Sequence, residues 1–354
     1  MSNNHLVIMA GGVGSRFWPM STPEKPKQFI DVLGTGRTLL QLTADRFTGI
    51  CPPENVWVVT AEKYRDIVKE QLPEVSDDHI LLEPCMRNTA PCIAYVSWKI
   101  KKRYPEANLV VSASDHIVTD VEEFVRVIRK GLEFTGSEDR ILTLGMKPTR
   151  PETGYGYIKM EREALGEGEI RKVEGFKEKP DRMTAEKYLR EGGYTWNSGI
   201  FLWSVSTVEK AFRSYQPKMS ALFDSLEDYF YTEKEREIIG QKFPDCEKIS
   251  VDYAIMEHAQ NIYVFPADFG WSDLGTWGSL YELSGKDKEG NAIIGERVKM
   301  VECRDCIVHL SGEHQIVLQG LEGYIVAEQN GVILICRKEE EQRIKEFSYG
   351  NKQS

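Results

Sequence analysis

Residues 1–146 alternate short apolar runs with segments of helical spacing, and this alternation constrains the possible folds more than any other feature of the chain. The apolar runs comprise residues 5–10, 55–61, 79–84, 108–115 and 140–145. Such alternation predicts an α/β fold of crossover units, with a mostly parallel sheet and helices on both of its faces. Ligands of such sheets bind at the carboxyl ends of the strands. We therefore expect the first glycine-rich segment and the segment "SASDH" to face one crevice.

That glycine-rich segment, "AGGVGSRFWPMS", ends the first apolar run. Gly11, Gly12 and Gly14 allow positive φ angles and leave backbone N–H groups uncovered, so they can cradle an anion. Arg16 and, further along the chain, Lys27 can neutralise phosphate oxygens beside the loop. The segment therefore predicts a site for several phosphates, as in a nucleoside triphosphate.

Two common phosphate motifs do not match this segment. A dinucleotide fingerprint needs a third glycine three residues after Gly14 and a helix that begins there, but Phe17 holds that position and Pro19 would interrupt a helix. A P-loop needs lysine and then serine or threonine directly after its last glycine, whereas the lysines here come later, at Lys25 and Lys27. We therefore expect a triphosphate loop of another kind.

Composition limits the classes of partner. The chain has 354 residues, of which 41% are hydrophobic and 28% charged, as in a globular protein of one large or two moderate domains. Its formal charge of −10 argues against general nucleic-acid binding, and no segment has the pattern of a membrane span or a signal peptide. Seven cysteines scattered through apolar segments favour a reducing compartment. We expect a cytoplasmic protein with no nucleic-acid or membrane partner.

Two aspartates from distant segments are candidate metal ligands. Asp115 follows an apolar strand-like run, where a carboxylate can bind Mg²⁺ held by a triphosphate. Asp273 lies between glycines and aromatic residues in "FGWSDLGTW". The alternative for Asp115 is a helix cap or a turn. Together with a glycine loop, the two carboxylates form a coherent metal site, although each alone is a weak signal.

Later segments contain candidates for a sugar phosphate. "FKEKP" ends a strand-like run with Glu178 and Lys179, a hydroxyl acceptor beside a phosphate donor, which point to opposite faces unless the chain bends before Pro180. A solvated, charged strand end is the alternative. Asn197 in "NSGIF" can bind sugar hydroxyls. The region from 151 to 205 therefore predicts an antiparallel lid or sheet extension that receives a second substrate.

The end of the chain has a different pattern. Residues 206–260 are expected to be helical, whereas the chain from about 288 consists of short apolar segments with turn residues between them. This spacing predicts a small β sandwich or solenoid, closed by a charged helix. We expect a catalytic domain over 1–287 and a C-terminal β domain over 288–354. Because this β domain has more apolar edge than it can cover alone, we also expect it to form a homodimer.

Seven ordered motifs give the chain a close resemblance to the bacterial mannose-1-phosphate guanylyltransferases of the sugar nucleotidyltransferase superfamily. The motifs, which span nearly the whole chain, are "AGGVGSRFWPMS" with "PKQF", "EPCMRNTAPCIA", "SASDH", "TGYGYI", "FKEKP", "WNSGIFLW" and "GWSDLGTW". The resemblance implies a Rossmann-like catalytic domain and a C-terminal left-handed β-helix used in dimerisation. It also implies Mg²⁺-dependent synthesis of GDP-mannose from GTP and mannose 1-phosphate, with release of pyrophosphate.

The same resemblance implies roles for individual residues. Those expected to be catalytic are Arg16, Lys27, Asp115 and Lys179. Those expected to bind the nucleotide are Ala10, Gly11, Gly12, Gly14, Ser15, Arg16, Glu83, Asn88 and Thr89. Those expected to bind the sugar phosphate are Gly154, Glu178, Lys179 and Asn197, and the metal ligands are Asp115 and Asp273. A phosphate monoester is already an anionic nucleophile, so no protein base is required.

Glu83, at the end of a strand-like run, is expected to select guanine. Guanine presents two adjacent N–H donors, and a carboxylate can accept a hydrogen bond from both, whereas an amide suits pyrimidines better. The resemblance to the superfamily points the same way, because its pyrimidine-specific members look to have glutamine at the matching strand end. The alternatives are that Glu83 caps the following helix or pairs with Arg87, or that backbone groups or Asn88 select the base.

Two other functions stay open at this point. A guanylyltransferase for another sugar 1-phosphate, such as a heptose or glucose phosphate, would keep every motif for triphosphate and metal. A non-catalytic nucleotide-sugar sensor would be expected to lack Lys27, Asp115 or Asp273, yet all three are present. The motifs therefore favour an enzyme, and the assignment of mannose as its sugar rests on the family resemblance alone.

Overall fold

The computed structural model describes residues 3–12, 14–136, 138–165, 169–311 and 314–347. The chain divides into two compact units. Unit 1 comprises residues 1–11, 43–114 and 118–271, and unit 2 comprises residues 12–42, 115–117 and 272–354. Unit 2 combines the end of the chain with two earlier segments, those that carry the glycine loop and Asp115. The division into domains expected at residue 287 stays a prediction.

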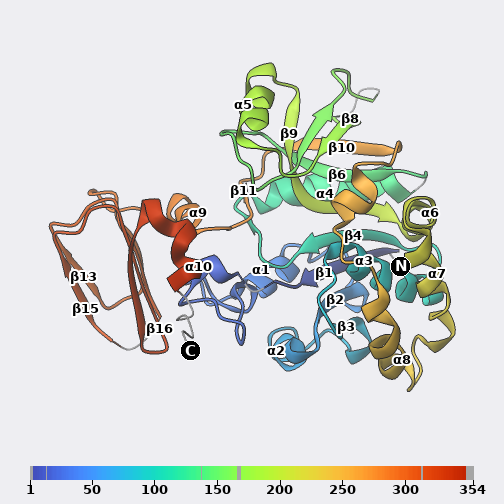
Figure 1. Ribbon diagram of the computed structural model, residues 1–354, viewed down its shortest axis with the longest axis horizontal. Coiled ribbons are helices and arrows are strands. Elements are labelled where there is room, and N and C mark those ends of the chain that lie inside the picture. Colours follow the sequence, from blue (N-terminus) through green and yellow to red (C-terminus); the bar gives the residue numbers. More distant parts are fainter. Residues whose placement is uncertain (1–2, 13, 137, 166–168, 312–313, 348–354) are drawn as a thin grey trace. The chain divides into compact units, whose positions relative to one another are not determined.

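Unit 1 contains a nine-stranded sheet in the order β3-β2-β1-β4-β9-β6-β10-β8-β7 (Figure 1). Its strands are β1 (Asn4–Ala10), β2 (Val56–Ala61), β3 (Ile80–Glu83), β4 (Asn108–Ala113), β6 (Ile141–Met146), β7 (Tyr157–Met160), β8 (Arg171–Lys177), β9 (Tyr194–Ser204) and β10 (Ile262–Ala267). Its helices are α2 (Arg65–Gln71), α3 (Thr89–Arg103), α4 (Val121–Gly136), α5 (Arg182–Glu191), α6 (Val205–Tyr215), α7 (Pro217–Asp224) and α8 (Glu235–Lys242). Three short elements contain points where the chain passes between the units: α1 (Leu39–Asp45), β5 (Ile117–Val118) and β11 (Trp271–Ser272).

The sheet is mixed, so the expectation of a mostly parallel sheet is confirmed only in part: β6 and β10 are parallel to each other, but antiparallel strands lie beside them. Strands β3, β2, β1 and β4 are parallel, as the alternation in the first part of the chain predicted. Strand β9 then pairs antiparallel with both β4 and β6, and β7 and β8 are antiparallel to each other. The apolar pattern of β9 shows that it is buried, but it carries no information on which strands will flank it, and the long strand from the expected lid lies inside the main sheet.

Helices cover both faces of this sheet. Helix α3 packs on the face that presents Val7 and Trp203, and α6, α7 and α8 enclose its other side in one hydrophobic cluster. This double contact explains why residues 90–100 of α3 are all buried. Helix α4 approaches the opposite face, where Gly131 lies against Leu142 and Leu202 so closely that a Cβ atom would contact both side chains at about 3 Å.

The C-terminal part of unit 2 is a solenoid of short strands in two small sheets. Its elements are α9 (Trp277–Leu283), β12 (Ala292–Ile294), β13 (Val298–Val301), β14 (Ile307–Leu310), β15 (Ile316–Gln319), β16 (Tyr324–Gln329), β17 (Val332–Arg337) and α10 (Ile344–Phe347). Strands β12, β14 and β16 are parallel in one sheet, and β13 and β15 are parallel in the other. The paired residues Ile307 and Ile325, like Val298 and Ile316, are 18 positions apart. Of the two expected architectures, the regular repeat of parallel strands agrees with the solenoid; its left-handedness stays a prediction.

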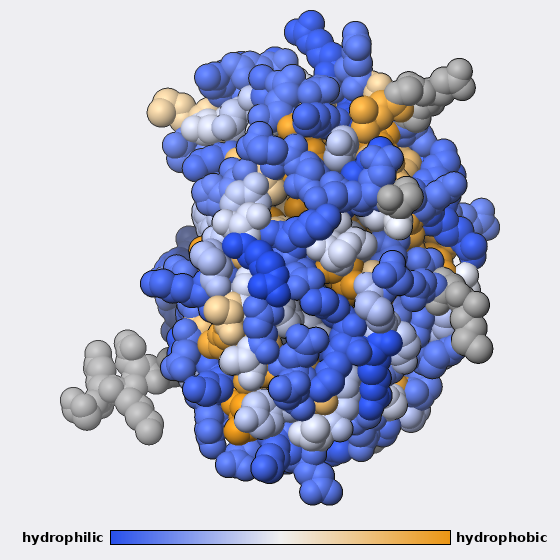
Figure 2. All heavy atoms as spheres, turned by 90° about the vertical axis from the view of Figure 1, so that its right-hand side faces the viewer, coloured by the Kyte–Doolittle hydropathy of each residue, from blue (hydrophilic) through white to orange (hydrophobic). Residues whose placement is uncertain are grey.

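Helix α10 and the preceding 3₁₀ turn, Lys338–Arg343, follow the last strand, as expected for the charged tail. Hydrophilic residues dominate the face of the molecule drawn in Figure 2, and apolar side chains appear on it in small groups. Within the described part of the chain, no helix combines the length and the apolar composition that a bilayer span requires.

Candidate functional site

The glycine loop has the backbone geometry that its sequence predicted. Gly12 and Gly14 have φ angles of 87° and 63°, in the left-handed region that only glycine adopts without strain. A 3₁₀ turn, Ser15–Phe17, follows at once, and it places Ser15 and Arg16 at the surface. The side chain of Gln28 donates to the Gly12 carbonyl at 3.2 Å, and this hydrogen bond stabilises the loop. In unit 1, Ala10 ends β1 and Gly11 follows it at the surface.

Lys27 is the centre of the polar cluster in unit 2. Its side chain is 7% exposed, and its ammonium group lies 3.1 Å from Asp115 Oδ2. It also donates to the carbonyls of Asp273 at 3.0 Å and Leu274 at 2.7 Å. These three partners match the three protons of a lysine ammonium. Lys27 therefore joins the two segments that carry the expected metal ligands, and it can reach a phosphate only by exchanging one of these bonds.

The ion pair sets the charge state of Asp115. Burial by itself would raise the pKa of this carboxyl, but the neighbouring charges of Lys27 and His116 and the hydrogen bond from Lys27 outweigh burial and lower it below its usual value. Asp115 is therefore an anion at neutral pH, as a metal ligand must be.

Asp273 lies in a tight turn. Its Oδ1 accepts from the Gly275 backbone at 3.1 Å, and Leu274 between them has a φ angle of 46°. Arg16 donates to the Gly275 carbonyl at 3.4 Å. A Cβ atom at position 275 would lie 2.7 Å from Asp273 Oδ2, so a larger residue there would displace the Asp273 carboxylate. The sequence suggested this tight turn through its glycines.

These residues line one cavity of about 270 Å³ in unit 2. Its walls include Gly14, Arg16, Lys27, Asp115 and Asp273. These five of the residues that were expected to hold the triphosphate and the metal are thus brought together from three separate segments. Two carboxylates fit Mg²⁺, which commonly takes one or two protein carboxylates and completes its shell with water and phosphate oxygens. The described residues contain no larger group of His, Cys, Asp and Glu that could bind a metal.

Glu83 in unit 1 is a buried carboxyl. It ends β3, is 9% exposed, and its Oε1 has no hydrogen-bond partner among the described residues. Burial raises the pKa of Glu83 to about 8. A buried polar atom without a partner is costly in a folded protein, so Glu83 is a candidate for contact with a ligand.

The two structural alternatives for Glu83 are not supported. The side chain of Arg87 donates to the Pro244 carbonyl, and the described chain shows no ion pair between it and Glu83. The helix α3 is capped by Asn88, whose Oδ1 accepts from Thr89 N at 2.9 Å. The first turn is further held by the segment before Asp252: Ala90 N donates to Ile249 O, and Thr89 Oγ1 accepts from Val251 N. Asn88 itself is exposed.

The sugar-phosphate candidates form a second cluster in unit 1. Lys179 has a φ angle of 43°, so the chain bends after β8, and its Nζ lies 2.7 Å from Glu178 Oε1. The bend is the condition under which both side chains were expected to serve one ligand. Glu178 is buried and Lys179 is exposed. Asn197, in β9, is hydrogen-bonded to Thr143 and to Asp252. Gly154 lies in an exposed turn, where its N–H donates to Glu152.

Asp252 is a member of this cluster that the sequence reasoning missed. It begins a π-helical turn, Asp252–Met256, and its Oδ1 accepts from Asn197 Nδ2 at 2.9 Å. The available signal was a single acidic residue within the apolar stretch "ISVDYAIM", where a solvated side chain is unexpected. The helical pattern expected over 206–260 gives no sign of this role.

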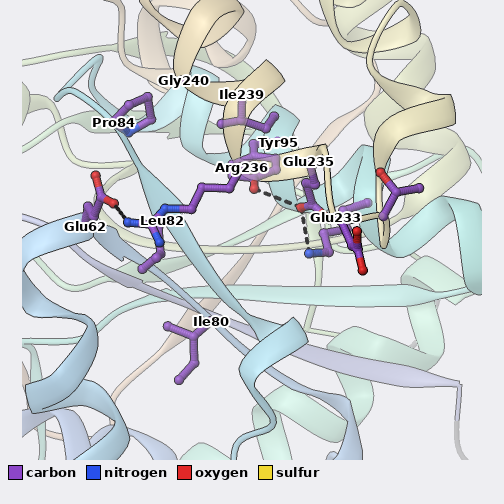
Figure 3. Close-up of a pocket in the computed structure, with 12 residues that line it drawn as sticks. Glu62, Ile80, Leu82, Pro84, Tyr95, Glu233, Glu235, Arg236, Ile239 and Gly240 are labelled. Atoms are coloured by element: carbon purple, nitrogen blue, oxygen red, sulfur yellow. Dashed lines mark hydrogen bonds and ion pairs between the residues drawn. The ribbon is translucent and has the colours of Figure 1, made fainter.

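A second cavity, of about 290 Å³, lies in unit 1 beside β3 (Figure 3). Glu235 at its wall accepts from Lys99 Nζ at 2.7 Å and from Tyr95 OH at 3.1 Å, and these groups appear joined by dashed lines in Figure 3. Arg236 pairs with Glu62 across the rim. This ion-pair network ties α8 to α3, so we assign it a structural role.

Comparisons with known proteins identify the family of this chain. Residues 5–290 match the family model described as nucleotidyl transferase. Mannose-1-phosphate guanylyltransferase 2 of Escherichia coli O157:H7 is 34% identical over 353 residues, which cover 96% of this chain and 72% of that protein. The alginate biosynthesis protein AlgA of Pseudomonas syringae pv. tomato is 35% identical, over 96% of this chain and 70% of the relative.

A solved structure is similar over the whole length. The crystal structure of a mannose-1-phosphate geranyltransferase from Thermus thermophilus superposes with a TM-score of 0.87 and 30% sequence identity, and the match covers 98% of each chain. The match to the family model and the extent of the similarity lead to one conclusion. The chain belongs to the nucleotidyl transferase family, and within it to the mannose-1-phosphate guanylyltransferases.

Proposed function

We propose that this enzyme transfers GMP from GTP to the phosphate of mannose 1-phosphate, which gives GDP-mannose and pyrophosphate. The observation that carries this proposal is the similarity to named mannose-1-phosphate guanylyltransferases over 96% or more of the chain. The two polar clusters support it, because they contain the charges and hydrogen-bonding groups that such substrates need.

The reaction requires no nucleophile from the protein. An oxygen of the sugar phosphate forms a bond to the α-phosphorus of GTP, and the bond from that phosphorus to the β-phosphate oxygen breaks, so pyrophosphate leaves with its electron pair. Catalysis then depends on alignment and on neutralisation of charge. We assign the loop amides of Gly12 and Gly14, with Arg16 and Lys27, to the triphosphate.

We assign Asp115 and Asp273 to a magnesium ion. The bound ion would supply charge neutralisation at the phosphate oxygens. Two carboxylates around one cavity, of which Asp115 is kept ionised by Lys27, fit this role. Lys27 also holds the Asp273 carbonyl, so it positions both segments.

We assign Glu83 and the start of α3 to the base, and the cluster of Glu178, Lys179 and Asn197 to the sugar phosphate. Glu83 would accept from the guanine N–H groups, with Asn88 and Thr89 beside it at the start of α3. Glu178 and Asn197 would contact mannose hydroxyls, Gly154 would contribute its backbone, and Lys179 would bind the sugar phosphate. Ala10, Gly11 and Ser15 complete the nucleotide-binding set.

A pyrophosphate-release assay tests the proposal. We expect turnover with GTP, mannose 1-phosphate and Mg²⁺, and much slower turnover with UTP, dTTP or ATP in place of GTP. A panel of sugar 1-phosphates, including glucose and heptose phosphates, identifies the sugar. Equal or faster turnover of another sugar phosphate would replace mannose in the proposal, and no pyrophosphate with any pair would reject it.

We further propose that the C-terminal solenoid, as a left-handed β-helix, forms a homodimer interface. Strand β17 is at the edge of its sheet, and Val317, Ile333 and Ile335 are each more than half exposed. An apolar edge strand is a surface that proteins normally cover. Light scattering at micromolar concentration should give a dimer mass, and Ile333→Asp with Ile335→Asp should give a monomer; a monomeric wild type would reject this proposal.

We also propose a cytoplasmic location. The seven cysteines are all free thiols, as in a reducing compartment. Labelling of the thiols in protein extracted from cells under acid quench should find them reduced.

A further inference from the structure

Asp252 fixes the orientation of the Asn197 amide. The carbonyl oxygen of Asn197 accepts from Thr143 Oγ1 at 2.9 Å and from Gly199 N at 3.2 Å. Its amide nitrogen donates one proton to Asp252 Oδ1 at 2.9 Å. A carboxamide has two acceptor positions and two donor protons. One N–H of Asn197 is therefore left for a ligand, and Asp252 determines which way it points.

The charges around Asp252 are not balanced. Asp252 shares this cluster with two other carboxyls, those of Glu178 and Glu257. The charge of Glu178 acts on Asp252, and Glu257 Oε1 accepts from the Glu178 N–H at 3.1 Å. The neighbouring cation is Lys179, which is bound to Glu178 at 2.7 Å. Burial, and next the charge of Glu178, raise the pKa of Asp252 to about 7, against the opposing effect of Lys179.

The other groups around Asp252 leave this imbalance in place. Strands β6 and β9 contribute the neutral side chains of Thr143 and Asn197. The segment after α6 contributes Gln216, which donates to the Ala254 carbonyl. On its own segment, Tyr253 is exposed, and His258 stacks on Tyr215. Within the described part of the chain, Lys179 is thus the cation on which the Glu178 and Asp252 pair depends.

A phosphate ligand would compete for that cation. The Lys179 side chain is 57% exposed, so it can turn from Glu178 toward a phosphate dianion. Glu178 and Asp252 would then face each other with less compensating charge, and like charges at short range favour protonation of one of them. Burial and the charge of Glu178 already raise the pKa of Asp252, so Asp252 is the group that takes up this proton.

We propose that Asp252 is a positioning residue that links binding of the sugar phosphate to uptake of one proton: it orients Asn197, and it becomes protonated when the phosphate draws Lys179 away from Glu178. This inference rests on the proposed function, because it takes the Glu178, Lys179 and Asn197 cluster to bind the sugar phosphate. A protonated carboxyl still accepts from Asn197 through its carbonyl oxygen, so the orientation is kept in both charge states.

Calorimetric titration of mannose 1-phosphate into the whole enzyme, in two buffers of different ionisation enthalpy, measures the proton directly in the wild type. At about pH 8 we expect uptake approaching one proton per site, after correction for the ligand's own titration. Asp252→Asn, which keeps an acceptor for Asn197, should take up almost none. Asp228→Asn, at an exposed position, is the matched control and should behave as wild type.

The pH profile of KM separates this role from a purely structural one. Wild-type KM for mannose 1-phosphate should rise up to about tenfold between about pH 7 and pH 8, whereas KM of Asp252→Asn should stay nearly level. Asp252→Ala, which loses the acceptor, should have a raised KM throughout. Binding without proton uptake by the wild type, or a wild-type pH profile in Asp252→Asn, would overturn the inference. Absence of binding and turnover by the wild type with mannose 1-phosphate would instead reject the proposed function.

Discussion

Replacement of Glu83 by glutamine tests how the enzyme selects its base. The variant keeps the shape of the side chain and removes its ability to become a carboxylate. Glu83 is buried at the end of β3, its Oε1 lacks a partner within the described chain, and burial raises its pKa to about 8. Guanine presents two adjacent donors to it, so the ionised carboxylate can accept both, whereas glutamine has one acceptor oxygen and an amide that faces the second donor.

The magnitude follows from two opposing quantities. Ionisation of a carboxyl with a pKa of about 8 at about pH 7 costs about 1.4 kcal/mol. Two charge-assisted hydrogen bonds contribute about 1.5–3 kcal/mol each, which leaves a net gain of about 2–5 kcal/mol. Since glutamine keeps one weaker bond, we expect kcat/KM for GTP to fall by a factor of about 10–1,000.

The assay compares kcat/KM for GTP, UTP and dTTP in the wild type, in Glu83→Gln and in Glu54→Gln, an exposed control. Discrimination against the pyrimidine triphosphates should relax only in Glu83→Gln. Because guanine binds the ionised form, the wild-type value for GTP should also increase as the pH rises toward about 8, and the Gln variant should lack this increase. An unchanged preference for GTP in Glu83→Gln would refute the reasoning and assign base selection to backbone groups or to Asn88.

Three further predictions concern the metal, the pH dependence of stability and the ion pair between Lys99 and Glu235. Asp273→Ala should lower Mg²⁺-dependent turnover by about 3–4 kcal/mol of transition-state stabilisation, as measured by pyrophosphate release; a rate near that of the wild type would show that Asp273 is no ligand. His309 is 3% exposed, and burial lowers its pKa from 6.5 to about 4. Because the folded protein must keep this imidazole neutral, the free energy of unfolding should be highest above pH 6.5 and should fall by about 3 kcal/mol in total as the pH drops toward 4. Urea unfolding across this range should show that loss and a smaller one in His309→Phe; equal slopes would contradict it. Lys99→Met leaves Glu235, whose side chain is 12% exposed, without its cation and should cost about 3–5 kcal/mol of unfolding free energy. The added change Glu235→Leu should recover part of this loss; a double variant no more stable than Lys99→Met would argue against the ion pair.

Local patterns in the sequence determined much of this protein. The alternation of apolar and helical segments predicted the parallel strands β1 to β4, because each of them pairs with a strand that lies nearby in the crossover order. Glycine spacing predicted the left-handed angles of Gly12 and Gly14, since these depend on the residue itself. Motif order also indicated the family, which the comparisons confirmed.

Tertiary structure alone decided the features that depend on partners distant in the sequence. Burial of β9 could be read from its composition, but its antiparallel place between β4 and β6 depends on which strand edges are free, and the apolar pattern is the same for either direction. The three bonds of Lys27 come from segments about 90 and 250 residues away, so the lysine's role as their link was not visible in its motif. Asp252 joined the sugar-phosphate cluster for the same reason: its charge state depends on Glu178 and Lys179 and its bond is to Asn197, residues that only the folded chain brings near it.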